Sequence, residues 1–578
     1  MRTDRFRPFA TLTAIALLGA TLACGDDDPV APPTPPGAPA NLDVVATAAT
    51  KASGSFTGVS DATSYIVQRA AGNGAFVAID TIATTTFEDT DLQASTNYRY
   101  RIVSMTGQTP GEVSPEIEIT TAPAGVVGTA ILTGDITANR RLRSDTLYVL
   151  SGFVKVLDGA TLTIDPGTRI VGDLKVSGSA LFIMRGARIE ANGTATQPIV
   201  FTSRRAVGTR KPGDWGGLLI IGRASVNRTG TTILEGSNAT ISGVPQSGID
   251  YAGGTLDDDS SGILRYVRVE FAGFGVAPNA ELNSFTFAAV GSGTTIEYLQ
   301  SMAGLDDSFE WFGGTVNAKY LVSYESGDDH FDAAEGYRGR NQFMIAMQST
   351  QLAPASGTGQ LASDPQGFEI DGCGSATGCP APAGASQQSA TPYTMPVFAN
   401  FTMIGTGELA VSGDNGGHGA VIRVGTGGTF INGVIARWPR SGISVRDTTT
   451  FNRESADSLI VSHLVLAENT AANFHTSTTG FTATDVRSRL DASTMSEHAG
   501  NAASLFAALP AVGVAPTTAT IDWTPSAGSP AATGGLAAFG GLVAERAGTF
   551  VTPTAYRGAA DPAGANKWWT GWTVYTRN

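Results

Sequence analysis

Apolar and polar residues alternate in short runs along most of this chain, and many of the runs end at Gly, Asn or Asp. Alternation with a period of two predicts β-strands, because successive side chains of a strand point to opposite faces. Residues 64–69, 98–102 and 160–164 are examples of such runs. The sequence therefore predicts an all-β protein.

A regular step appears in the second half of the pattern. Phe287, Phe309 and Phe331 follow one another at a constant interval. A step in the low twenties, with glycine at the corners, predicts a β-solenoid whose coils bury their apolar faces by stacking. We expect the three phenylalanines to form an interior stack. The smaller offset between Leu162 and Leu181 predicts slightly shorter coils nearer the N-terminus.

Several segments carry a family resemblance. They are Trp-Gly-Gly-Leu at 215–218, Arg-Tyr-Val-Arg-Val-Glu-Phe-Ala-Gly at 265–273, Phe-Glu-Trp-Phe-Gly-Gly at 309–314 and Trp-Thr-Gly-Trp-Thr at 569–573. These look like the right-handed parallel β-helix of pectin-lyase-like proteins, and their order resembles a family of bacterial exported lipoproteins of unassigned role. The resemblance implies a β-helix domain at 126–578 and implies no reaction. We expect the terminal tryptophans Trp568, Trp569 and Trp572 to cap its last coil and to block edge-to-edge pairing.

Residues 39–123 form a separate group of short alternating strands, with turn residues at the intervals of a β-sandwich. Within them, Asp-Leu-Gln-Ala-Ser-Thr-Asn-Tyr-Arg-Tyr-Arg at 91–101 resembles the corner of fibronectin type III domains. The resemblance makes Tyr98 the corner tyrosine, whose hydroxyl bonds to the upstream backbone, and places Phe56 where the family has a core tryptophan. The predicted fold class is all-β, a fibronectin type III-like sandwich followed by a right-handed parallel β-helix.

The N-terminus has the pattern of an exported protein. Basic residues precede an apolar stretch that is too short to span a membrane as a helix. Thr-Leu-Ala-Cys at 21–24 resembles the lipobox of bacterial lipoproteins, which implies a signal peptide at 1–23 and a lipid on Cys24. Gly25 then implies anchoring in the outer membrane, with the surface or periplasmic side left open. The alternative is an ordinary secretory signal with an unmodified cysteine.

Residues 24–38 are rich in proline. Proline at this density predicts an extended, semi-rigid linker between the lipid and the first domain.

The composition and net charge of the chain limit the classes of partner that it is expected to bind. The chain has 578 residues, a formal net charge of -14 at pH 7, and only 15% charged residues. An acidic surface disfavours nucleic acid and electrostatic binding to anionic lipid, whereas it is compatible with bound cations.

Two cysteines remain beyond Cys24. Cys373 and Cys379 flank a short loop that contains glycine. In an exported chain this pattern predicts one disulfide, because two thiols without nearby histidines are too few for a zinc site. No glycine run ends in Gly-Lys-Ser or Gly-Lys-Thr, so we expect no organic cofactor.

Carboxylates recur with the same step as the phenylalanines and are the best candidates for chemistry. Stacked coils lie ~4.8 Å apart, so like charges would face one another unless a cation neutralises them. Calcium takes six to eight oxygen ligands and suits such a ladder. The alternative is that the aspartates accept backbone N–H bonds at turns or pair with nearby cations. A segment at 368–372 extends the row after an insertion. The candidate ligands are Asp306, Asp307, Glu310, Asp328, Asp329 and Asp332.

Four further residues near the ladder are candidates for ligand binding. Trp311 is placed to stack on a sugar ring. Lys319, Arg338 and Arg340 are basic groups that a polysaccharide lyase would need beside its acidic calcium ligands. A glycosidase would instead use two of the carboxylates.

Two classes of function follow. The first is a non-catalytic, outer-membrane-anchored lipoprotein whose β-helix binds a glycan or an envelope partner. The second is a calcium-dependent polysaccharide lyase or glycoside hydrolase. Because fold alone does not establish activity, we prefer the first.

Overall fold

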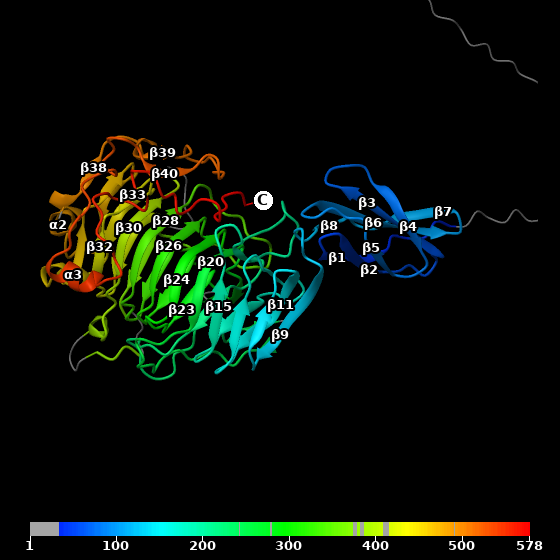
Figure 1. The fold of residues 1–578 in the computed structure, drawn as a ribbon, viewed down its shortest axis with the longest axis horizontal. Helices are drawn as coiled ribbons and strands as arrows, with labels where there is room; N and C mark the ends of the chain where they lie inside the picture. Colours follow the sequence, from blue (N-terminus) through cyan, green and yellow to red (C-terminus); the bar gives the residue numbers. More distant parts are fainter. Residues whose placement is uncertain are drawn as a thin grey trace, which may run out of the picture.

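The computed structural model describes residues 34–241, 243–277, 280–373, 378–381, 386–407, 416–490 and 492–577. Figure 1 shows a small sandwich beside one end of a long stack of coils. The predicted signal peptide, Cys24 and the linker up to residue 33 lie outside the described residues. Within the described ranges, no helix combines the length and apolar character needed to cross a membrane.

The N-terminal part is a sandwich of two antiparallel sheets. One sheet contains β1 (Ala40–Ala48), β2 (Lys51–Thr57) and β5 (Thr86–Asp89). The other contains β3 (Ser64–Ala71), β4 (Val77–Ile82), β6 (Asn97–Thr106), β7 (Thr109–Val113) and β8 (Ile117–Thr120). Alternate side chains of both sheets form one core, as the period-two pattern predicts.

The fibronectin type III-like corner is confirmed. The backbone N–H of Gln93 donates to the Tyr98 hydroxyl over 2.9 Å. Phe56 is buried and packs edge-on against Tyr65, with ring centroids 4.8 Å apart. The end of the proline-rich segment lies along this sandwich, because the Glu112 N–H donates to the Pro36 carbonyl over 2.9 Å.

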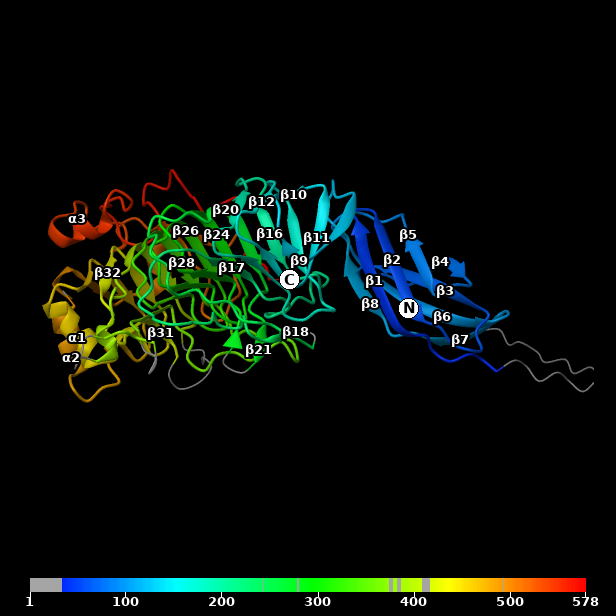
Figure 2. The same ribbon diagram turned by 90° about the horizontal axis from the view of Figure 1, so that it is seen from below.

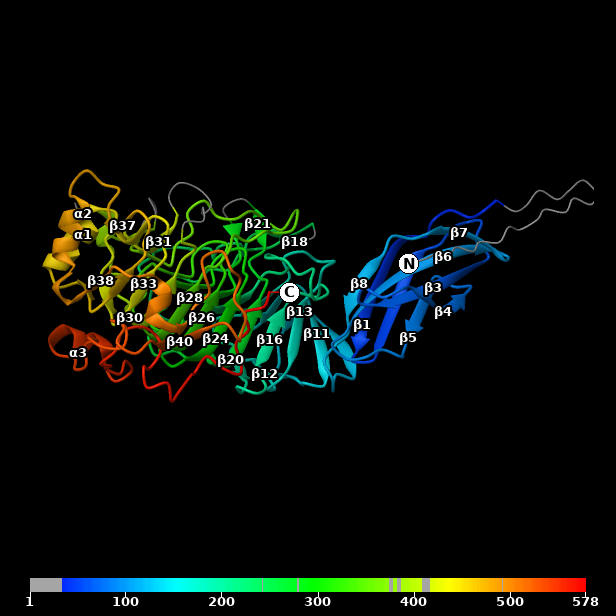
Figure 3. The ribbon, with the colours of Figure 1, turned by 90° about the horizontal axis from the view of Figure 1, so that it is seen from above.

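The second part is a right-handed parallel β-helix, and the predicted fold class is confirmed. Each coil runs through three faces, which pair with the equivalent faces of neighbouring coils. Figures 2 and 3 show the coils stacked side by side along the length of the molecule. Five long strands bend from the first face to the second, namely β20 (Gly262–Glu270), β24 (Thr295–Met302), β26 (Asn317–Tyr324), β28 (Arg340–Met347) and β30 (Val397–Ile404).

The other strands belong mostly to one face. The first face adds β10 (Arg140–Leu142), β12 (Thr161–Ile164), β15 (Arg188–Asn192), β32 (Gly428–Ile431) and β35 (Leu459–Ser462). The second adds β13 (Arg169–Gly172), β16 (Ile199–Thr202), β33 (Val434–Ala436), β36 (Val465–Ala467) and β38 (Ser496–His498). The strands β9 (Gly128–Ile136) and β11 (Thr146–Val156) span the second and third faces.

The third face positions the candidate site. Its strands are β14 (Ala180–Ile183), β17 (Leu218–Ile221), β23 (Phe285–Ala288), β25 (Phe309–Phe312), β27 (Phe331–Ala334), β29 (Phe368–Asp371), β31 (His418–Arg423), β34 (Ser441–Val445) and β37 (Ala472–His475). Small pairs and helices lie outside the coils: β18 (Thr240–Ile241), β19 (Val244–Pro245), β21 (Gly275–Ala277), β22 (Ala280–Glu281), β39 (Phe506–Ala508), β40 (Asp522–Pro525), α1 (Thr448–Ser455), α2 (Ala483–Arg489) and α3 (Gly541–Ala547).

The interior phenylalanine stack exists, with one change of register. Phe309 pairs with Phe331 as predicted, and their ring centroids lie 5.4 Å apart. The preceding member is Phe285, not Phe287, because the coil before Phe309 is slightly longer than the coil after it. Phe287 is also buried but pairs with Trp311.

The prediction of shorter coils nearer the N-terminus is wrong. Leu162 pairs with Ile189 and not with Leu181, so this coil is longer than the coil from Phe309 to Phe331. Leu181 belongs to the third face and pairs with Val154, whereas Leu162 belongs to the first face. The apparent repeat therefore compared two different faces that share the same apolar pattern.

The C-terminal tryptophans do not cap the last coil as predicted. Trp572 packs edge-on against Tyr266 and Tyr298, at centroid distances of 5.7 Å and 6.1 Å. Trp568 packs against Tyr320 at 5.3 Å. The chain therefore returns along the side of the β-helix after β38, and Figure 1 shows its red end running back along the coils toward the sandwich.

Candidate functional site

Three adjacent strands of the third face carry an outward row of carboxylates. Glu310 of β25 pairs in register with Asp332 of β27, which pairs with Glu369 of β29. The phenylalanines one position earlier in each strand point into the core, so these carboxylates point outward. We call Glu310, Asp332 and Glu369 the acidic row.

A second file lies at the corner just before the same strands. Asp307 accepts the backbone N–H of Asp329 over 2.8 Å, and Asp329 accepts the N–H of Gln366. Asn283 accepts the Asp307 N–H over 3.1 Å in the preceding coil, and Gln366 accepts the N–H of His418 in the following one. We call Asn283, Asp307, Asp329 and Gln366 the corner ladder. Its aspartates bond the backbone of the next coil, as the structural alternative expected.

The corner and the row together bring the predicted cation ligands into three groups. The oxygens within each group lie within 4.8 Å of one another. Bound Ca²⁺ holds its ligands at ~2.4 Å, so one ion reaches oxygens up to about 4.8 Å apart. The groups are Asp306, Asp307 and Asp328; Asp307, Glu310 and Asp332; and Asp329, Asp332 and Glu369.

Protein groups satisfy this cluster only in part. The Arg423 guanidinium donates to Glu369 over 2.7 Å and to Asp371 over 2.8 Å. The Asn283 amide donates to Glu310. Buried Asp332 Oδ1 and Glu369 Oε1 have no hydrogen-bond partner among the described residues. Unsatisfied buried oxygens are costly, which makes these two atoms natural ligands for an ion.

The pKa values of the carboxyl groups also favour a bound cation. Burial is the main cause that raises the pKa of the carboxyl groups, and neighbouring carboxylates raise it further. For Asp328, burial and then the charge of Asp364 raise the pKa to about 7. The cluster therefore takes up protons unless a cation replaces them.

A hollow opens beside the corner ladder. Its lining includes Asp328, His330, Gln348, Gln366 and Trp438. His330 on this wall is buried, although its sequence neighbours are acidic. It is 2% exposed, its Nδ1 lies 2.6 Å from the Ser323 hydroxyl, and burial lowers its pKa to about 3. The ring is therefore neutral at pH 7.

Trp311 does not form the predicted sugar-stacking surface. Its indole is fully buried and stacks on the Phe309 and Tyr337 rings at 6.2 Å and 5.3 Å. The period-two pattern placed Trp311 on the same side of its strand as Phe309, and that side is the core.

The three basic candidates bond elsewhere. Arg338 forms an ion pair with Asp257 at 2.9 Å. Arg340 donates to the Arg546 carbonyl over 2.6 Å, and Lys319 lies over the Phe550 ring at 4.6 Å. Lys319 and Arg340 belong to the first face, so proximity in sequence did not bring them to the acidic row on the third.

Sequence reasoning missed Arg423, Asn283 and Gln366. Asn283-Ser284-Phe285 matches Asp307-Ser308-Phe309 position by position, and this pattern was a usable signal for the corner ladder. Arg423 carried no such signal, because a long insertion between β27 and β29 and another before β31 separate it from the repeat.

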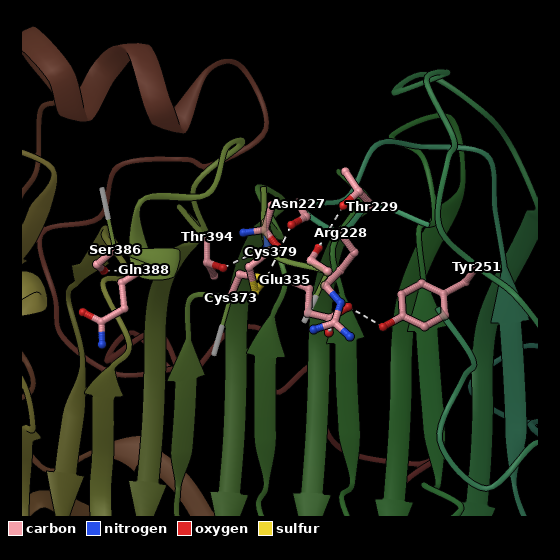
Figure 4. Close-up of a disulfide and its surroundings, with 12 residues drawn as sticks. Asn227, Arg228, Thr229, Tyr251, Glu335, Cys373, Cys379, Ser386, Gln388 and Thr394 are labelled. Carbon is pink, nitrogen blue, oxygen red and sulfur yellow. Dashed lines mark hydrogen bonds and ion pairs between the residues drawn. A yellow bond between two sulfur atoms is a disulfide. The ribbon is translucent and has the colours of Figure 1, made fainter. Parts of the chain in front are cut away.

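The predicted disulfide joins Cys373 and Cys379. Figure 4 shows it just beyond the ends of the third-face strands, beside the loop that carries Asn227 and Arg228. The Thr229 N–H donates to the Gly378 carbonyl over 2.9 Å, so the disulfide loop packs onto the loop after β17.

The fold and the site define a parallel β-helix protein with a half-buried acidic row on one face. The chain belongs to the pectate-lyase-like β-helix family, because the model of that family, described as a pectate-lyase like beta helix domain, matches residues 134–522. Membership in this family fits a carbohydrate-related role. No curated protein matches the chain.

Solved structures match small parts of the chain. A crystal structure of chicken CNTN1 FN1–FN3 domains shares 18% identity over 15% of this chain, with a TM-score of 0.15. A Fn3-like protein from Clostridium thermocellum shares 25% identity over 15% of this chain and 92% of its own, with a TM-score of 0.14. The chain covers 32% of the CNTN1 structure. The N-terminal part is assigned as a fibronectin type III-like sandwich from its own strands and from the Tyr98 corner.

Proposed function

We propose that this chain is an exported cell-envelope lipoprotein, anchored in the outer membrane through Cys24, whose β-helix binds a glycan or another envelope component without catalysis. The observation that carries the proposal is the acidic row, because its oxygens suit a divalent cation that an acidic glycan can share. Membership in the pectate-lyase-like family supports a carbohydrate as the partner.

Calcium suits the acidic row better than a proton or an arginine alone. Hard cations take carboxylate oxygens from several residues at once, and the three groups offer such sets around shared aspartates. Arg423 neutralises only the end of the row at Glu369 and Asp371. A cation near Asp332 would neutralise the middle, where Oδ1 has no partner among the described residues.

A binding role is favoured over lyase chemistry because the basic residue beside the acidic row, Arg423, is not free to accept a proton. A lyase needs a basic group that accepts a proton. Arg423 is held by two carboxylates, and a guanidinium stays protonated in proteins. The other predicted bases bond residues away from the acidic row.

Glycoside hydrolysis is the second candidate. Asp328 lines the hollow beside His330, and its pKa of about 7 is that of a general acid at neutral pH. Hydrolysis further requires a second carboxylate across the sugar, and the candidate is Asp364, whose charge acts on Asp328.

A glycan array with the purified chain tests the proposal. We expect binding in Ca²⁺ that is lost in EDTA and in an Asp332→Asn, Glu369→Gln double variant. The matched control is Asp158→Asn, which removes an exposed carboxylate paired with Arg223 in an earlier coil. Blank arrays in both buffers would contradict the binding proposal. Cleavage of an arrayed glycan by the wild type, abolished by Asp328→Asn, would establish the hydrolase instead.

A further inference from the structure

The sandwich and the first coils of the β-helix enclose a cavity. Its walls come from β1 and β8 on one side, and from β11, β13 and the loop at 203–210 on the other. Figures 2 and 3 show the sandwich packed against these coils. Cross-domain bonds hold the walls together, including Lys175 to Asp43 over 2.5 Å and Val207 N–H to Thr120 Oγ1 over 2.8 Å.

Arg169 on the cavity wall is a charged residue between apolar neighbours on the adjacent strands of its sheet. It pairs in register with Leu147 of β11 and Val200 of β16, and both of these are buried apolar side chains. Arg169 is itself partly buried. A guanidinium in an apolar file contributes no packing advantage over Leu or Val.

The Arg169 guanidinium makes no hydrogen bond or ion pair with the described residues, although nearly every other charge around it does. Glu270 attracts Arg169 electrostatically, but its two oxygens already bond Thr202 over 2.8 Å and Arg268 over 3.0 Å. Burial and the neighbouring Arg210 lower the pKa of Arg169 to about 10. The protein thus keeps an unpaired cation where burial penalises it.

The carboxylates that line the cavity form ion pairs or hydrogen bonds with residues other than Arg169. Asp43 pairs with Lys175, and Glu116 pairs with Arg99 at 2.9 Å. Glu118 accepts from Asn97 over 3.2 Å. The positive lining is larger: Arg169, Lys175, Arg204, Arg205 and Arg210. Arg204 pairs with Asp173 at 3.8 Å and Arg205 with Asp214 at 2.7 Å, so the charge available to a ligand is that of Arg169.

We propose that the cavity at the domain junction binds a small oxyanion, the carboxylate or phosphate group of an organic ligand, on Arg169. A planar guanidinium matches either group with two parallel N–H···O bonds. The apolar wall around it, which includes Leu147, Val171 and Ile119, suits a ligand with an organic body attached to the anionic group. Because both domains line the cavity, the ligand also bridges the sandwich and the β-helix.

Isothermal titration of the full chain with acetate, glucuronate and inorganic phosphate tests this site. We expect saturable binding of at least one, with affinity at least about tenfold lower in Arg169→Gln. Preference for glucuronate over phosphate would identify an acidic sugar as the source, and the reverse a phosphate ester. The matched control is Arg141→Gln, because Arg141 is an exposed arginine in a neighbouring coil that pairs with Asp165.

An Arg169→Lys variant keeps the charge and removes the planar fork, so its affinity should lie between those of the wild type and Arg169→Gln. This variant also keeps the test informative if Arg169→Gln fails to fold. Absence of saturable binding by the wild type for all three anions would overturn the proposal. So would equal affinity in wild type, Arg169→Gln and Arg169→Lys. EDTA should leave this binding unchanged, which separates it from the cation site on the acidic row.

Discussion

Individual carboxylates of three adjacent coils have two different roles. Asp307 and Asp329 accept backbone N–H groups and fix the corner from one coil to the next. Asp332 and Glu369 face outward with one oxygen each that no described residue satisfies. The same functional group is therefore structural at the corner and available for a ligand on the face.

The buried carboxyl groups give stability a definite dependence on pH. The pKa of Asp328 is about 7 in the folded chain, whereas an unfolded aspartate has a pKa of about 4. Between these values the folded state holds a proton that the unfolded state has released. The free energy of unfolding in EDTA should therefore fall as pH rises from about 4 to about 7, by at most ~1.4 kcal/mol per pH unit for each such group.

Calcium should reverse this trend, because it favours the ionised carboxylates. Urea denaturation at a series of pH values, in EDTA and in Ca²⁺, measures both effects. Asp328→Asn should flatten the profile in EDTA, since it removes the titrating group. A wild-type profile in EDTA that is level or rises over this range would contradict the assignment of raised pKa values.

Among the elements, the long strands bend between the first and second faces at one residue with a positive φ. Tyr266, Tyr298, Tyr320 and Phe343 occupy this position in successive coils, with φ between 50° and 63°. A left-handed conformation costs such residues roughly 1–2 kcal/mol each. Stacking offsets part of that cost, because the Tyr298 ring lies 4.4 Å from both Tyr266 and Tyr320.

The returning C-terminal segment covers this aromatic file and is held by two reciprocal side-chain contacts. The Gln300 amide donates to the Val574 carbonyl over 2.6 Å and accepts the Val574 N–H over 2.9 Å. Gln342 bonds Thr552 in the same way, over 2.7 Å and 3.0 Å. Each glutamine side chain thus bonds one backbone N–H and one backbone carbonyl of the segment, as a neighbouring β-strand would.

A Gln300→Ala, Gln342→Ala double variant should release this segment. These hydrogen bonds are lost, each worth about 1 kcal/mol, and buried backbone groups remain unsatisfied. Limited proteolysis should cut the variant after α3 faster than the wild type, while Gln351→Ala, an exposed glutamine, should behave as wild type. Equal cleavage rates in all three proteins would show that the tryptophans alone hold the segment.

The elements differ in how far the sequence predicts them. The Tyr98 corner and the pairing of Phe309 with Phe331 follow from local motifs and a constant step. The longer step from Phe309 back to Phe285 breaks that constancy, and the three faces share one apolar pattern, which is why Leu162 was matched to the wrong face. Arg423 reaches Glu369 across an insertion whose length no periodicity constrains.

At the scale of the whole molecule, the sandwich precedes the β-helix in the chain and contacts its first coils. Figure 1 places it at the far end of the molecule from α2 and α3, beside the first coils. Under the anchoring proposal, the sandwich separates the β-helix from the lipidated part of the chain. This arrangement suits a protein that presents one long side face to a partner.

Replacing the lipidated residue tests the anchoring proposal. Cys24→Ser should move the protein from the membrane fraction to the soluble fraction of the exporting cell, because the acyl chains supply the membrane affinity. Cell fractionation with immunoblotting measures the shift, and Cys373→Ser with Cys379→Ser serves as the control that leaves Cys24 intact. Retention of the Cys24→Ser protein in the membrane fraction would rule out a lipid anchor at this residue.

Calcium calorimetry on the purified chain is the most direct test of the acidic row as a cation site. The account predicts saturable binding by the wild type and by Asp158→Asn, and loss of that binding in the Asp332→Asn, Glu369→Gln double variant. Asn and Gln keep the shapes of the two side chains, and Arg423 keeps its bond to Asp371, so the variant should fold and the comparison stays interpretable. Absence of saturable binding by the wild type, or unchanged binding by the double variant, would contradict the account.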